Sequence, residues 1–168
     1  MKEIKTIIMD LGGVYFTRGS YLAIEKLINI YDIKDRRSVW KFFSDSYEQE
    51  GRHIRLGLIT MDEFEERFIK KYNIDESKLE YIRQIWFGSY VPHYGMHDLV
   101  LKLSKIYRLI VFSGNIRERV EFLDNRYGFL DHFDDTVFSF DYQTNKNSID
   151  FYNILLNHIN CKPVKFAE

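Results

Sequence analysis

The chain has 168 residues, of which 45% are hydrophobic and 29% charged, as in a globular protein of one domain or one domain with an insertion. Its net charge of -1 gives no attraction to nucleic acid, and its apolar runs are far shorter than the ~20 residues of a membrane span. The chain does not open on an apolar secretory segment, so a cytoplasmic location is expected, and the single cysteine excludes an internal disulfide and a thiolate metal cage.

The first predicted element is a short apolar strand at residues 4–9, which ends at Asp10 and the glycine pair Gly12-Gly13. From residue 20 to residue 86, apolar side chains recur at spacings of three and four, which predicts helices and no strand. Four residues are expected to begin helices: Ser20, Asp35, Thr60 (with Glu63, as a capping box) and Asp75.

Strands and helices alternate in the rest of the chain, which predicts a parallel sheet with helical crossovers. The expected strands are residues 107–112, 136–139 and 164–168, and the expected helices are residues 96–105, 116–127 and 148–158. The predicted fold is a Rossmann-like α/β core made of residues 1–16 and 93–168, with a helical cap inserted at residues 17–92.

Polar residues follow three of the predicted strands. They are Asp10, the turn Ser113-Gly114-Asn115, and Lys146 at the end of a polar loop. Because ligands of open α/β sheets bind beyond the carboxyl ends of the strands, these groups are expected to converge. A carboxylate nucleophile, a hydroxyl with turn amides and an ammonium group together make a site for phosphoryl chemistry.

The segments strand-Asp10-Leu11-Gly12-Gly13-Val14, strand-Ser113-Gly114-Asn115 and Lys146 resemble the first three motifs of the haloacid dehalogenase-like (HAD) hydrolase superfamily. The resemblance covers nearly the whole chain, including the helical cap. It implies a Mg²⁺-dependent phosphatase that acts on a small phosphorylated metabolite through an aspartyl-phosphate. Asp10 would be the nucleophile, and Asp10 and the Gly12 carbonyl would bind Mg²⁺. The implied phosphate-binding residues are Ser113, Gly114, Asn115 and Lys146.

The sequence departs from the family pattern at several positions. Gly12 stands where phosphatases of the family usually carry a second Asp that protonates the leaving group, so an acid from water or from the cap is needed. Asn147-Ser148 replaces a frequent Pro-Asp, and Gln143 replaces a glycine. The acidic pair of the fourth motif would fall beyond Glu168.

These departures keep two other functions open. One is a catalytically impaired relative that binds a phosphorylated ligand or a protein partner. The other is a metal-independent 2-haloacid dehalogenase, which also forms an aspartyl ester but needs no second Asp. In the family's strand order the absence of strands four and five leaves the Asp10 strand at an edge of the sheet. Since open apolar edges pair with other chains, we expect a longer polypeptide or a homo-oligomer formed through this edge.

Overall fold

The computed structural model describes residues 4–46, 49–75, 77 and 80–159. Three strands form one parallel sheet in the order β1-β2-β3: β1 (Thr6–Met9), β2 (Arg108–Ser113) and β3 (Asp135–Phe138). Ile110 of β2 pairs with Ile8 on one side and with Asp135 on the other. The predicted α/β class is therefore confirmed, and the strand predicted at residues 164–168 lies outside the described residues.

Within the described part of the chain, β1 has a strand neighbour on one side only. It is therefore the edge strand that the sequence predicts. The Ile8 side chain on it is 42% exposed, so this edge presents apolar surface as well as unpaired backbone groups. Pairing of this edge with a second chain stays a prediction.

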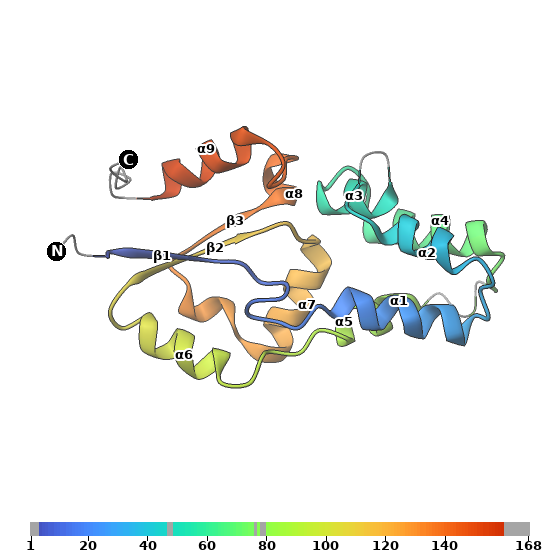
Figure 1. Ribbon diagram of the computed structural model, residues 1–168, viewed down its shortest axis with the longest axis horizontal. Helices are drawn as coiled ribbons and strands as arrows, with labels where there is room; N and C mark the ends of the chain where they lie inside the picture. Colours follow the sequence, from blue (N-terminus) through green and yellow to red (C-terminus); the bar gives the residue numbers. More distant parts are fainter. Residues whose placement is uncertain (1–3, 47–48, 76, 78–79, 160–168) are drawn as a thin grey trace.

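Helices cover both faces of the sheet (Figure 1). Helices α6 (Met96–Leu103) and α7 (Arg117–Tyr127) lie on one face and α9 (Ile149–His158) on the other. Two short elements flank β3: the 3-10 helix η2 (Leu130–His132) and α8 (Ser139–Tyr142). The continuous apolar sequence of β2 reflects burial on both faces, because Leu109 belongs to the large core whereas Ile110 packs against Phe151 of α9.

Between β1 and α6 the described residues form five helices and no strand, as predicted. We call them the insert: α1 (Gly19–Ile30), α2 (Arg36–Phe43), α3 (Glu50–Arg55), α4 (Met61–Tyr72) and α5 (Glu80–Gly88). The insert lies beyond the carboxyl end of β1 (Figure 1). None of the helices in the described ranges is both long and apolar enough to cross a membrane.

Side-chain caps fix the beginnings of two insert helices where the sequence predicts them. Asp35 accepts a hydrogen bond from the Ser38 backbone N–H at 3.0 Å and so begins α2. Thr60 and Glu63 form the expected capping box at the start of α4. Helix α1 begins at Gly19 instead of after a Ser20 cap, because the Ser20 hydroxyl is engaged in tertiary hydrogen bonds.

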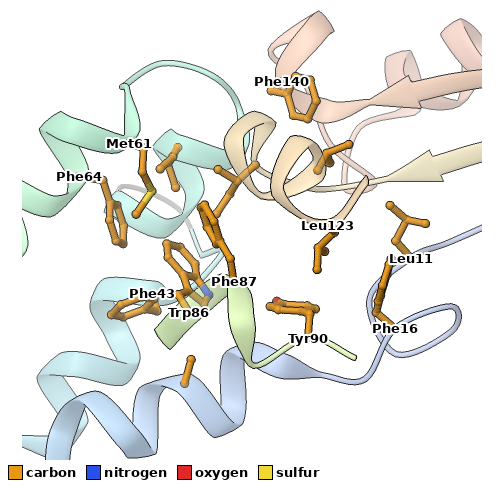
Figure 2. Packing of buried hydrophobic residues seen from close by; sticks show 14 of the residues in the cluster. Leu11, Phe16, Phe43, Met61, Phe64, Trp86, Phe87, Tyr90, Leu123 and Phe140 are labelled. Atoms are coloured by element: carbon orange, nitrogen blue, oxygen red, sulfur yellow. The ribbon is translucent and has the colours of Figure 1, made fainter. Parts of the chain in front are cut away.

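Aromatic rings fill the interior of the insert. The ring of Trp86, which is fully buried, lies 4.6 Å from that of Phe43 and 5.0 Å from that of Phe64, measured between centroids. Figure 2 shows Tyr90 between this aromatic group and Phe16 of the α/β core. All of these side chains belong to one continuous hydrophobic cluster, so the insert and the core are packed as a unit.

The two segments that join the insert to the core pair with each other in antiparallel fashion. The Thr17 N–H donates to the Val91 carbonyl, and the His93 N–H donates to the Tyr15 carbonyl, both at 2.9 Å. The insert therefore leaves and re-enters the core at one place. We call this pair of segments, residues 15–17 and 91–93, the neck.

Candidate functional site

The structure brings Asp10 and Lys146 into direct contact. The Lys146 Nζ lies 2.7 Å from Asp10 Oδ2, and both side chains are about one-third exposed. Asp10 directly follows β1, and its Oδ1 accepts a hydrogen bond from the Leu11 N–H at 2.8 Å. The Lys146 Nζ also lies 5.1 Å from the centre of the Phe112 ring, so a side chain of β2 makes a cation–π contact with this lysine. A carboxylate and an ammonium group from opposite ends of the sequence are thus paired at the carboxyl edge of the sheet.

Asp10 and Lys146 line a pocket of about 210 Å³. Gly12 and Gly114, two more of the predicted site residues, line the same pocket. Four of the residues that the sequence assigns to the site are therefore gathered around one hollow. It lies where parallel strands end, which is the usual location of ligand sites in open α/β sheets.

Ser113 and Asn115 are not among the residues that line this pocket. Ser113 ends β2 and is only 1% exposed. The Asn115 side chain is also buried, and its Oδ1 accepts hydrogen bonds from Arg119 Nε at 2.7 Å and from the Ile116 N–H at 3.0 Å. Asn115 therefore orients a buried arginine, and a role of these two residues in phosphate binding stays a prediction.

Asn145 is a pocket-lining residue that the sequence analysis did not single out. It is 5% exposed, and its Oδ1 accepts a hydrogen bond from the Asn147 N–H at 3.0 Å. Within the described ranges, Asn145 Nδ2 is the buried side-chain polar atom that lacks a hydrogen-bond partner. Such an unsatisfied donor costs about 1–3 kcal/mol of stability. The signal in the sequence was its position directly before Lys146.

The insert contributes a second carboxylate to the pocket, Asp45, from the segment that follows α2. Its side chain is accessible to solvent, yet the surrounding protein desolvates it. Desolvation raises the pKa of Asp45, and the positive charges of Arg55 and Arg52 only partly oppose this effect. No spacing in the sequence connects Asp45 with Asp10, so the contact of this loop with the site emerges only from the fold.

A buried cation joins the insert to the turn after β2. Arg119 is 3% exposed, and among the described residues no carboxylate forms an ion pair with it. Burial lowers the pKa of Arg119 from its usual value to about 10. Its Nη1 donates to the Tyr90 hydroxyl at 2.9 Å, and its guanidinium lies 4.5 Å from the centre of the Tyr90 ring.

The Tyr90 hydroxyl extends this network into the insert. It lies 2.7 Å from Ser20 Oγ, which also accepts a hydrogen bond from Trp86 Nε1 at 2.8 Å. Burial alone would raise the pKa of Tyr90, but the positive charges of Arg119 and Arg55, together with hydrogen bonding to Ser20, outweigh burial and leave the pKa lowered. The polar atoms of α1, α5 and α7 are therefore tied together in the interior.

A second pocket, of about 260 Å³, lies between the insert and helices α7 and α8. Its charged side chains already have partners. Glu63 caps the Thr60 N–H at 2.7 Å, Arg117 pairs with Asp141 at 2.8 Å, and Glu118 accepts from a backbone N–H at 3.3 Å. We therefore place the candidate site in the Asp10 pocket.

The chain was compared with known proteins. No family model matches it. An uncharacterized protein from Dictyostelium discoideum is 26% identical over 159 residues, which are 92% of this chain and 66% of that protein. The chain thus spans just under two thirds of the length of this curated relative.

Two groups of solved structures share the fold. A HAD-family enzyme from Bacteroides thetaiotaomicron, crystallised with magnesium and inorganic phosphate, matches with a TM-score of 0.78 at 20% identity, over 93% of this chain and 79% of that one. The L-2-haloacid dehalogenase of Xanthobacter autotrophicus, with chloropropionic acid covalently bound, matches with a TM-score of 0.64 at 15% identity, over 97% of this chain and 68% of that one. The described chain therefore has the HAD-like α/β fold that the resemblance of its motifs predicts.

Proposed function

We propose that this protein is a phosphohydrolase of small phosphorylated metabolites and that Asp10 is its nucleophile. One observation carries the proposal: Asp10 and Lys146 form a 2.7 Å ion pair inside a pocket that Gly12 and Gly114 also line. The ammonium group offsets the negative charge of an incoming phosphoryl group, which Asp10 alone would repel. The magnesium- and phosphate-bound HAD-family enzyme with the same fold supports this choice of substrate class.

The proposed reaction has two displacements. The Asp10 carboxylate forms a bond to phosphorus as the bond between phosphorus and the leaving oxygen breaks, which gives an aspartyl-phosphate. Water then attacks this intermediate, releases inorganic phosphate and restores the carboxylate. Lys146 stabilises negative charge on the phosphoryl oxygens in both steps.

The leaving oxygen needs a proton, and we assign its delivery to Asp45. Gly12 cannot supply one, whereas Asp45 lines the pocket and its pKa is raised by desolvation. A raised pKa keeps more of the carboxyl group protonated near neutral pH, as a general acid requires. The resulting Asp45 carboxylate can accept the proton of the attacking water in the second step.

The pocket offers oxygen donors suited to Mg²⁺. The Asp10 carboxylate and the Gly12 carbonyl would hold the ion, and Mg²⁺ commonly takes one or two carboxylates together with substrate phosphate. When bound, it would neutralise charge on the phosphoryl group. In the described ranges no three His, Cys, Asp or Glu side chains are grouped to hold a metal, so substrate and water would complete the coordination.

A metal-independent 2-haloacid dehalogenase is the second candidate. Gly12 favours it, because a halide leaves without a proton and this reaction needs no second acid. The fold is shared with an L-2-haloacid dehalogenase that holds chloropropionic acid covalently. A catalytically impaired relative that only binds a phosphorylated ligand or a protein partner is the third.

Two assays separate these candidates. One measures hydrolysis of p-nitrophenyl phosphate with and without Mg²⁺, and the other measures release of chloride from 2-chloropropionate. We expect Mg²⁺-dependent phosphatase activity that is lost in Asp10→Asn. That variant breaks a partly exposed ion pair, so its free energy of unfolding should change by less than about 1 kcal/mol. Asp131→Asn changes an exposed carboxylate in η2, the short helix before the amino end of β3; it is the matched control and should stay active. Full activity of Asp10→Asn would refute the mechanism, and chloride release alone would favour the dehalogenase.

A further inference from the structure

The amide of Asn145 presents a hydrogen-bond donor that the protein itself does not use. The side chain is 95% buried, lines the Asp10 pocket, and its Nδ2 has no partner among the described residues. Buried polar groups in native proteins are nearly always paired, so an unpaired one at a pocket wall points to a ligand. The ligand must offer a hydrogen-bond acceptor, because Nδ2 can only donate.

The orientation of this amide is fixed by the backbone. The Asn147 N–H donates to Asn145 Oδ1 at 3.0 Å, and the Ser148 N–H donates to the Asn145 carbonyl at 3.0 Å. Rotating the amide by a half-turn would place the NH₂ group against the Asn147 N–H, donor against donor. The turn before α9 therefore engages Oδ1 through the Asn147 N–H, and Nδ2 is left without a partner among the described residues.

We propose that Asn145 Nδ2 donates a hydrogen bond to a phosphoryl oxygen bound in the Asp10 pocket, which makes Asn145 a substrate-binding residue. The proposal rests on the proposed phosphohydrolase function. Lys146 is already paired with Asp10, and Asp45 adds another carboxylate to the same wall. A phosphoryl group that enters between these carboxylates needs further donors. A neutral amide supplies such a donor. An additional cation would also bind the phosphoryl group, but it would weaken Asp10 as a nucleophile, which the neutral amide does not.

Two substitutions test this assignment. Asn145→Asp has the same shape and keeps an acceptor for the Asn147 N–H, but it replaces the donor by a negative charge. Asn145→Ala removes the donor without adding charge. The matched control is Asn147→Asp, which adds the same charge two residues away on an exposed side chain. Binding of inorganic phosphate in the presence of Mg²⁺ is measured by calorimetry and by the rise in melting temperature that phosphate produces. Because each variant is compared with its own phosphate-free form, a loss of stability is separated from a loss of binding.

We expect phosphate to bind at least about tenfold more weakly to Asn145→Ala and about a hundredfold more weakly to Asn145→Asp, with Asn147→Asp close to the unchanged protein. The KM for p-nitrophenyl phosphate should rise in the same order. If the unchanged protein binds phosphate and both Asn145 variants bind it equally well, the assignment of Asn145 is overturned while the proposed function stands. If the unchanged protein neither binds phosphate nor hydrolyses the ester, both are overturned.

Discussion

Replacing Tyr90 with phenylalanine is expected to lower the free energy of unfolding by about 2.5–4 kcal/mol. The substitution keeps the aromatic ring beside the Arg119 guanidinium but removes the hydroxyl. That hydroxyl accepts a hydrogen bond from Arg119 Nη1 at 2.9 Å and lies 2.7 Å from Ser20 Oγ. The first bond involves a buried charge and contributes about 1.5–3 kcal/mol, and the neutral bond to Ser20 contributes about 1 kcal/mol.

Urea unfolding followed by far-UV circular dichroism measures this loss. In a chain of this size 1 kcal/mol corresponds to about 2–4 °C, so the melting temperature should fall by roughly 5–15 °C. Tyr94→Phe deletes the same atom from a fully exposed tyrosine and should cost less than about 0.5 kcal/mol. In an Arg119→Met background the cost of Tyr90→Phe should shrink by about 1.5–3 kcal/mol, because no cation remains to be satisfied. Equal costs in both backgrounds would show that the hydroxyl does not support Arg119.

Three further substitutions test other parts of the structure. Asp45→Asn should slow hydrolysis of alkyl phosphates by about 10²–10⁴-fold but p-nitrophenyl phosphate far less, because nitrophenolate leaves without a proton; equal slowing of both would exclude an acid role. Hydrogen bonds from His158, the Thr136 backbone N–H and Arg108 together outweigh burial and lower the pKa of Asp135, so the stability that Asp135 contributes is present above pH 4 and disappears as pH falls through the lowered value. Asp135→Asn should therefore cost about 1 kcal/mol at pH 7 and progressively less as the pH falls below 4, and a cost independent of pH in melting experiments would contradict this. Gln143 has a left-handed backbone with φ of 50°, so Gln143→Gly should raise the free energy of unfolding by about 0.5–1 kcal/mol, and a lower melting temperature would refute the assumed strain.

The parts of the site that could be predicted from the sequence are those that the sheet positions. Asp10 follows a strand, and Lys146 follows the polar loop after another. Parallel strands bring their carboxyl ends to one edge whatever the details of packing, so the two charged groups had to approach each other. The positions of the helices could also be predicted, because apolar periodicity and caps such as Asp35 involve residues that are close together in the sequence.

The residues that escaped prediction depend on contacts between distant segments. Asp45 reaches the pocket from the insert, and only the packing of the insert on the core brings it there. Ser20 is placed in the sequence where a helix cap is expected. Its hydroxyl instead forms hydrogen bonds with Tyr90 and Trp86, which are far away in the sequence. For Ser20, tertiary partners occupy the hydroxyl that a local helix cap would use.

The pairing of the two neck segments has a consequence for how the insert could change during evolution. Its two segments are hydrogen-bonded side by side, so the ends of the insert are adjacent whatever lies between them. The entropy of closing a loop grows only slowly with its length once its ends are held together. Helices could thus be added to or removed from the region between Thr17 and Val91 without shifting the register of β1 against β2. Substrate preference could diversify by exchange of this region, while Asp10 and Lys146 kept their positions at the edge of the sheet.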